Sequence, residues 1–164
     1  MPDVVLMMGS DSDWPTLEPV IATLRELGVT ATARVLSAHR TPDQARAFVA
    51  ECEKGGTKVF ICAAGVAAHL AGAVAAHTAR PVIGIPVASG PLNGFDALLS
   101  TVQMPPGVPV ATVAINGAVN AAVLAAQIIA TGDNALHEKL VKWRASQTLK
   151  VLEKDKRLQE KLQG

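Results

Sequence analysis

The sequence is poor in aromatic residues and in charge of either sign. Its 164 residues include three Phe, two Trp and no Tyr, and the formal net charge is +1. So few aromatic rings leave little surface on which a nucleobase or a flavin could stack. A nearly neutral chain has no overall electrostatic attraction to nucleic acid or to an anionic membrane. We therefore expect neither of these as a partner.

Cysteine is also scarce, and no long apolar run is present. Cys52 and Cys62 lack CxxC spacing and fall in a predicted helix and a predicted strand, so we expect reduced thiols in a cytoplasmic protein. No apolar run reaches the length of a membrane-spanning helix. The start, MPDVVLMMG, has no basic segment before its apolar run, so we expect no secretory signal.

Apolar residues, in contrast, are plentiful: they make up 49% of the chain, enough for a packed core. Short apolar runs that suit buried strands alternate with segments of helical periodicity. The pattern predicts strands at residues 4–8, 30–37, 58–65, 81–87 and 108–115, and helices at 13–28, 41–56, 67–78, 94–103 and 120–132. This alternation predicts an α/β fold, a three-layer α/β/α sandwich around a five-stranded parallel sheet.

The predicted organisation is an α/β catalytic domain at residues 1–133 and a C-terminal helical tail at 134–164, within one structural unit. The tail is rich in basic residues, and a nucleic-acid-binding arm is one interpretation. The interpretation we favour is a solvated helix whose Leu136, Leu140 and Trp143 edge docks on its own or another subunit.

Two Ala-rich helices, at residues 67–78 and 117–131, have little polar face to show to water. A helix of this composition is normally buried on all sides. In a domain this small a neighbouring subunit is the natural cover, so we expect a homo-oligomer.

Four polar loops follow the first four predicted strands. They read GSDSD (9–13), SAHR (37–40), AAGVAAH (63–69) and PVASGPLNG (86–94). In an open parallel sheet, ligands bind beyond the carboxyl ends of the strands. We therefore expect these loops to form one site.

The first loop has the chemistry of an anion or sugar site. Gly9 permits close backbone approach, Ser10 and Ser12 offer hydroxyls, Asp13 offers a carboxylate, and free N–H groups start the next helix. The alternative is a simple N-cap, because Ser and Asp are preferred there. A cap accounts for one of these residues and leaves the others without a function.

The second loop, SAHRTP, adds a proton carrier and a phosphate ligand. His39 can exchange a proton near neutral pH, and Arg40 can bind phosphate in a bidentate manner. The alternative is an exposed turn with Thr41 as the N-cap of the following helix. That interpretation explains Thr41 but neither His39 nor Arg40.

The spacing of the remaining histidines and the absence of several known motifs limit the types of reaction that the site can catalyse. His69 lies near the predicted site, whereas we expect His77 to be structural and His137 to lie on the surface; their spacing does not suit a metal site. No GxSxG elbow, Walker loop or dinucleotide fingerprint is present. The pattern indicates proton transfer on a small phosphorylated substrate, without metal or redox cofactor.

The motifs also resemble those of a known family. MGSDSDW, SAHRTP, AAGVAAHLAG, PVIGIPV and STVQMPPGVPVATVAI are similar, in order and spacing, to class I N(5)-carboxyaminoimidazole ribonucleotide mutases of bacterial purine biosynthesis. The resemblance covers roughly residues 3–145. It implies a flavodoxin-like fold, a homo-octamer, and transfer of a carboxylate from the exocyclic nitrogen to carbon 4 of an aminoimidazole ribonucleotide, with no cofactor, metal or covalent intermediate.

Residue roles follow from the same resemblance. His39 matches the catalytic histidine, Ser10, Ser12, Asp13 and Arg40 match ribose- and phosphate-binding positions, and Ser37 lies beside them. The loop from Gly65 to His69 matches the stretch that encloses the carboxylate. Val66 stands where a second glycine is usual and Ala71 where proline is usual.

Two alternatives remain at this stage. One is direct carboxylation of aminoimidazole ribonucleotide by carbon dioxide on the same fold; Arg40, where that branch has Lys, and the AAHL stretch favour the mutase. The other is a non-catalytic flavodoxin-like module that binds a phosphate ligand. The loops after the fourth and fifth strands lack the aromatic residues of a flavin carrier and the Lys of a phosphorylation receiver.

Overall fold

Five parallel strands form the middle layer of the protein. The computed structural model describes residues 1–163, and its sheet has the strand order β2-β1-β3-β4-β5. The strands are β1 (Val4–Met8), β2 (Ala31–Val35), β3 (Val59–Gly65), β4 (Val82–Val87) and β5 (Ala111–Thr112). This order, with helices on both faces, is the flavodoxin-like arrangement. The predicted fold class is confirmed.

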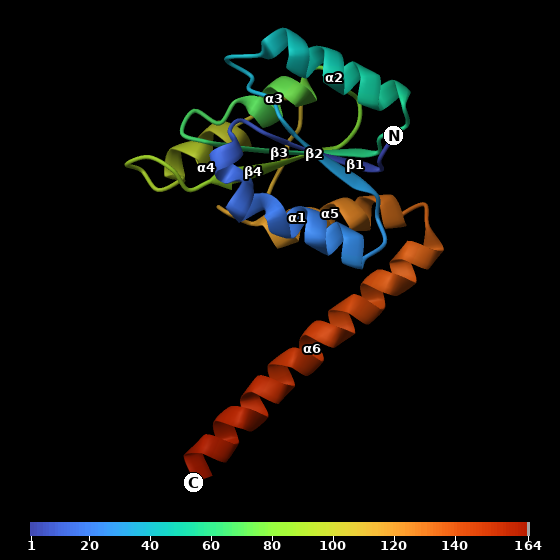
Figure 1. Ribbon diagram of the computed structural model, residues 1–164, viewed down its shortest axis with the longest axis vertical. Helices are drawn as coiled ribbons and strands as arrows, with labels where there is room; N and C mark the ends of the chain where they lie inside the picture. The colour runs from blue at the N-terminus through green and yellow to red at the C-terminus, as the bar shows by residue number, and fades with distance from the viewer. Residues whose placement is uncertain (164) are drawn as a thin grey trace.

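Helices cover both faces of the sheet (Figure 1). On one face lie α1 (Trp14–Glu26), which follows the short 3-10 helix η1 (Asp11–Asp13), and α5 (Ala118–Ala130). On the other lie α2 (Pro42–Lys54), α3 (Leu70–Ala75) and α4 (Phe95–Val102).

Each face of the sheet buries its own apolar cluster. In β1, Val4, Leu6 and Met8 pack toward α1 and α5, whereas Val5 and Met7 pack toward α2 and α3. Successive side chains of a strand point to opposite faces, so a strand that is covered on both sides must be apolar throughout. This requirement explains the continuous apolar run by which the sequence predicts β1.

Strand β2 differs from the prediction. It pairs only with β1 and forms an edge of the sheet, where Arg34 and Val35 are exposed. The expectation of a buried second strand is therefore wrong, because a strand at the edge has a neighbour on one side only. The fifth strand is shorter than predicted: Ala111 and Thr112 alone pair with β4.

The tail forms one long helix, α6 (Asn134–Gln163), as predicted; residue 164 lies outside the described residues. Leu136 and Leu140 are buried against the α1–α5 face of the same chain, and Trp143 packs beside them. Beyond Trp143 the helix extends away from the body of the protein (Figure 1).

No helix among residues 1–163 combines the length and apolar character needed to cross a membrane.

Gly84 in β4 lets α4 pack closely on the sheet. A Cβ atom at this position would overlap Cγ2 of Thr101 and lie 3.0 Å from Cγ1 of Val110 and 3.4 Å from Cβ of Ala71. We expect Gly84→Ala to lower the free energy of unfolding by about 1–3 kcal/mol, the usual cost of overpacking a core. Thermal unfolding of the variant measures this, and Gly132→Ala, where a Cβ would meet no atom within 4 Å, is the control. An unchanged melting temperature would show that α4 can shift to make room.

Candidate active site

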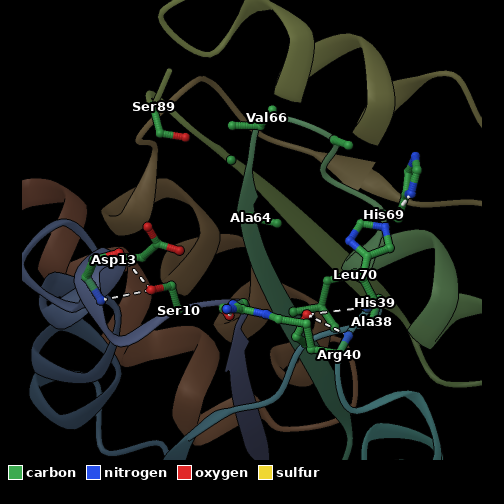
Figure 2. A pocket seen from close by; sticks show the side chains of 15 residues that line it. Ser10, Asp13, Ala38, His39, Arg40, Ala64, Val66, His69, Leu70 and Ser89 are labelled. Atoms are coloured by element: carbon green, nitrogen blue, oxygen red, sulfur yellow. Dashed lines mark hydrogen bonds between the residues drawn. The ribbon is translucent and has the colours of Figure 1, made fainter.

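The loops after β1, β2, β3 and β4 meet around one cavity of about 410 Å³ at the carboxyl edge of the sheet. This volume lies within the range of small-molecule sites. Figure 2 shows Ser10 and Asp13 on one side of the cavity and His39 and His69 on the other. The structure brings every predicted site residue to the lining of this cavity: Ser10, Ser12, Asp13, Ser37, His39, Arg40, Gly65 and His69.

The serine loop acts as both a cap and a polar wall. The hydroxyl of Ser10 accepts a hydrogen bond from the backbone N–H of Ser12 at 3.3 Å and so caps η1. The Ser10 and Ser12 hydroxyl oxygens also lie 2.8 Å apart, within hydrogen-bond distance. The capping interpretation therefore holds for Ser10, while the side chain of Ser12 remains at the cavity.

Asp13 precedes α1, but its carboxylate makes no capping hydrogen bond. Burial raises the pKa of Asp13, and the negative charge of neighbouring Asp11 raises it further. Asp11 itself borders a different hollow, beside Trp14 and Arg34. Asp13 is thus the carboxylate that the loop presents to the cavity, with acceptor oxygens available for hydroxyl groups.

Ser37 organises the turn that carries His39 and Arg40. Its hydroxyl oxygen accepts hydrogen bonds from the backbone N–H groups of His39 at 3.3 Å and Arg40 at 3.2 Å. Thr41 precedes α2, as predicted, but makes no side-chain capping bond. Its hydroxyl instead accepts from the N–H of Ser37 and donates to the carbonyl of Ser37. The expectation of a side-chain cap from Thr41 is therefore wrong, because the turn uses that hydroxyl.

Arg40 joins the first two loops. Its Nη2 donates a hydrogen bond of 2.9 Å to the backbone carbonyl of Gly9, 31 residues earlier in the chain. A guanidinium carries five N–H donors, so further donors remain for an anion. Arg40 therefore combines a structural contact with the capacity to bind a ligand.

The two histidines of the cavity contact each other. Nε2 of His39 lies 2.7 Å from Nδ1 of His69, and the two rings are nearly perpendicular, at 78°. This bond connects the loop after β2 to the loop after β3. His77 borders a separate small hollow between α2 and α3, and His137 is exposed on α6. Residues 1–163 contain no cluster of three or more His, Cys, Asp and Glu that could hold a metal ion.

Ser89 is the hydroxyl-bearing residue of the cavity that sequence reasoning did not single out. It follows β4 and lines the cavity. A Cβ at Gly65 would overlap the Ser89 hydroxyl and lie 3.1 Å from the Ser89 Cβ, so these two loops approach each other closely at this glycine. A hydroxyl directly after the fourth strand, like the serines after the first and second, is the signal that could have identified it.

Comparison with known proteins agrees with this geometry. The family model described as AIR carboxylase matches residues 3–150. The chain belongs to the AIR carboxylase family. Within this family, it is 52% identical to an N5-carboxyaminoimidazole ribonucleotide mutase of Brucella melitensis over 93% of this chain and 95% of the relative. It is 51% identical to the Escherichia coli K12 protein of the same name, over 92% and 90% of the two chains.

Solved structures lead to the same family. The crystal structure of Treponema denticola PurE matches with a TM-score of 0.85 and 30% identity, covering 94% of this chain and 97% of that one. The resemblance read from the motifs is therefore confirmed.

In this member of the AIR carboxylase family, Val66 has an unusual backbone. Its φ is +52°, in the left-handed region that is costly for a β-branched residue. We expect Val66→Gly to raise the melting temperature by about 2–4 °C, the effect of about 1 kcal/mol in a domain of this size. Val66→Ala, which retains a Cβ, is the control and should gain less. A melting temperature that falls in Val66→Gly would contradict the strain argument.

Proposed function

We propose that this protein is an N5-carboxyaminoimidazole ribonucleotide mutase, an isomerase of de novo purine biosynthesis. It converts N5-carboxyaminoimidazole ribonucleotide to 4-carboxy-5-aminoimidazole ribonucleotide. The observation that carries the proposal is the placement of His39 in one cavity with hydroxyl, carboxylate and guanidinium groups. Relatives about half identical over most of their length bear the mutase name, which supports it.

In this proposal, the polar side of the cavity holds the ribose and the phosphate. Arg40 supplies charged donors for the phosphate, together with the hydroxyls of Ser10 and Ser12. The carboxylate of Asp13 accepts hydrogen bonds from ribose hydroxyls. Ser37, whose oxygen already accepts two backbone bonds, retains its hydroxyl hydrogen for the ligand.

The reaction proceeds by loss and return of carbon dioxide. His39 protonates the exocyclic nitrogen while the bond between that nitrogen and the carboxylate carbon breaks. This step releases carbon dioxide and leaves neutral aminoimidazole ribonucleotide. Carbon 4 then attacks the carbon dioxide, and His39 recovers its proton from carbon 4. Gly65 and His69 border the carboxylate, where confinement keeps the two reactants together.

This sequence of steps needs no metal and no redox cofactor. The transfer is redox-neutral overall: the carboxylate carbon exchanges a bond to nitrogen for a bond to carbon 4, carbon 4 exchanges a bond to hydrogen for that bond, and no electrons enter or leave the substrate. One proton leaves His39 and one returns, so the enzyme ends each turnover in its starting state.

The second candidate is direct carboxylation of aminoimidazole ribonucleotide, the activity that the family's name describes. A single assay distinguishes the two. The carboxyamino ribonucleotide is supplied without bicarbonate, and product is followed by ultraviolet absorbance. Turnover under these conditions supports the mutase; turnover only from aminoimidazole ribonucleotide and carbon dioxide supports the carboxylase.

We also propose that the protein is a cytoplasmic homo-oligomer, an octamer. Large apolar side chains stay exposed on and beside α4: Leu92, Phe95, Leu99 and Val102. Others stay exposed on the projecting part of α6: Leu149, Val151, Leu152, Leu158 and Leu162. A second copy of the chain is the cover that would remove these side chains from water. Light scattering at micromolar concentration tests the proposal, which a monomer would contradict.

We also propose that the chain consists of an α/β catalytic domain at residues 1–133 and a C-terminal helical tail at residues 134–164, within one structural unit. All residues of the cavity lie between Gly9 and Ser89. The first segment thus supplies the catalytic groups of this chain, and the tail serves assembly.

A further inference from the structure

We infer that His69 is a positioning residue: through its Nδ1 it fixes the tautomer and orientation of the His39 ring. The inference rests on the proposed function and adds to the place of His69 at the edge of the carboxylate site. It starts from the short bond between the two imidazoles, Nε2 of His39 to Nδ1 of His69, at 2.7 Å.

A bond between two ring nitrogens contains a single proton, because two N–H groups cannot point at each other and two lone pairs do not attract. The protonation of His69 at Nδ1 therefore decides whether Nε2 of His39 is a donor or an acceptor. His39 must give one proton to the substrate and take one back at a defined ring nitrogen. The donor or acceptor state of its Nε2 therefore determines which of its two ring nitrogens can exchange that proton.

The backbones on both sides of this bond are held in place. The N–H of His39 donates to the Ser37 hydroxyl. The N–H of His69 donates to the carbonyl of Ala67, and the carbonyl of His69 accepts from the N–H of Ala73, both at 2.9 Å.

Those contacts place the two Cα atoms but leave the rings free to turn. Both histidines are exposed, so packing alone does not hold the rings. The inter-ring bond is the contact within residues 1–163 that orients the His39 ring.

The identity of the bonded atom gives a sharp test. Nδ1 is attached directly to Cγ of histidine, and the terminal O and N atoms of asparagine are also attached directly to Cγ. Glutamine carries its terminal atoms one bond farther out, near the position of Nε2. Asparagine at position 69 can therefore reproduce the contact to His39, whereas glutamine and leucine cannot.

The experiment measures kcat and KM separately for His69→Asn, His69→Gln and His69→Leu, using the carboxyamino ribonucleotide. We expect His69→Gln and His69→Leu to lose about 10- to 100-fold in kcat, the cost of a misplaced catalytic group, while KM changes little. His69→Asn should retain most of the wild-type kcat. His77→Asn, exposed just beyond α3 and outside the cavity, is the matched control and should behave as wild type.

Two results would overturn the inference. One is a loss of kcat in His69→Asn as large as in His69→Leu. The other is a rise in KM with unchanged kcat in all three variants, which would assign His69 to substrate binding alone. Melting temperatures identify any variant that loses activity by unfolding, and His69→Gln then replaces His69→Leu in the comparison.

Failure of the proposed function gives a different result. In that case the wild-type protein itself does not convert the carboxyamino ribonucleotide. The same variants are then compared in the carboxylation of aminoimidazole ribonucleotide, where His39 would remove the proton from carbon 4 and release it to solvent. The order Asn above Gln and Leu is expected there too, and its absence would overturn the inference.

Discussion

Replacing His39 with Asn should remove turnover and leave the fold intact. Asparagine cannot carry a proton to and from the substrate, and general acid–base catalysis by one side chain contributes about 10²- to 10⁴-fold in rate. The His39 side chain is exposed and contacts His69 rather than the core, so its loss should change the free energy of unfolding by about 0.5 kcal/mol or less. The measurement is kcat on the carboxyamino ribonucleotide, together with the melting temperature.

His77→Asn is the control for this variant, because it makes the same change outside the cavity. It should retain full activity. A loss of less than about 10²-fold in kcat for His39→Asn would remove His39 from its proposed role. A large fall in melting temperature would instead show that the histidine pair has a structural function that its exposure does not suggest.

Replacing Arg40 with Ala should have the second largest effect, chiefly on KM. The variant loses a charged hydrogen-bond donor to the phosphate, a loss of about 1.5–3 kcal/mol, or about 10- to 100-fold in kcat/KM. It also loses the bond to the carbonyl of Gly9, which joins the loop of Ser10 to the loop of His39. We therefore expect a rise in KM together with a smaller fall in kcat, measured by steady-state kinetics.

Arg40→Lys separates the two contributions. Lysine retains the charge but not the planar fork of donors, so it should recover only part of the lost kcat/KM. Arg25→Ala, at the far end of α1, is a control for the change in net charge and should leave kcat/KM unchanged. Equal kinetics in wild type and Arg40→Ala would show that phosphate binds elsewhere.

The sequence alone predicts most of the fold because the relevant signals are local. The continuous apolar run at Val4–Met8 suits a strand buried on both faces, and it pairs with a neighbour on each side. The α/β alternation then implies parallel strands whose carboxyl ends share one edge. On that basis the loop of Ser10 and Asp13 and the loop of His39 and Arg40, which are far apart in sequence, could be expected at one cavity.

Some features have no local signal. Periodicity does not say which strand lies at an edge, and the exposure of Val35 follows from the strand order. Thr41 is a residue type that often caps a helix, yet its hydroxyl bonds to the backbone of Ser37. The turn and the helix cap compete for this one hydroxyl.

The sequence by itself therefore determined the alternation of strands and helices and the edge of the sheet at which the polar loops gather. Tertiary structure alone decided that Nδ1 of His69 meets Nε2 of His39 and that Arg40 meets the carbonyl of Gly9. These pairs are 30 and 31 residues apart in the chain. A contact of that kind depends on the path of the backbone through three dimensions and on side-chain rotamers, and neither is encoded in the periodicity of a short segment.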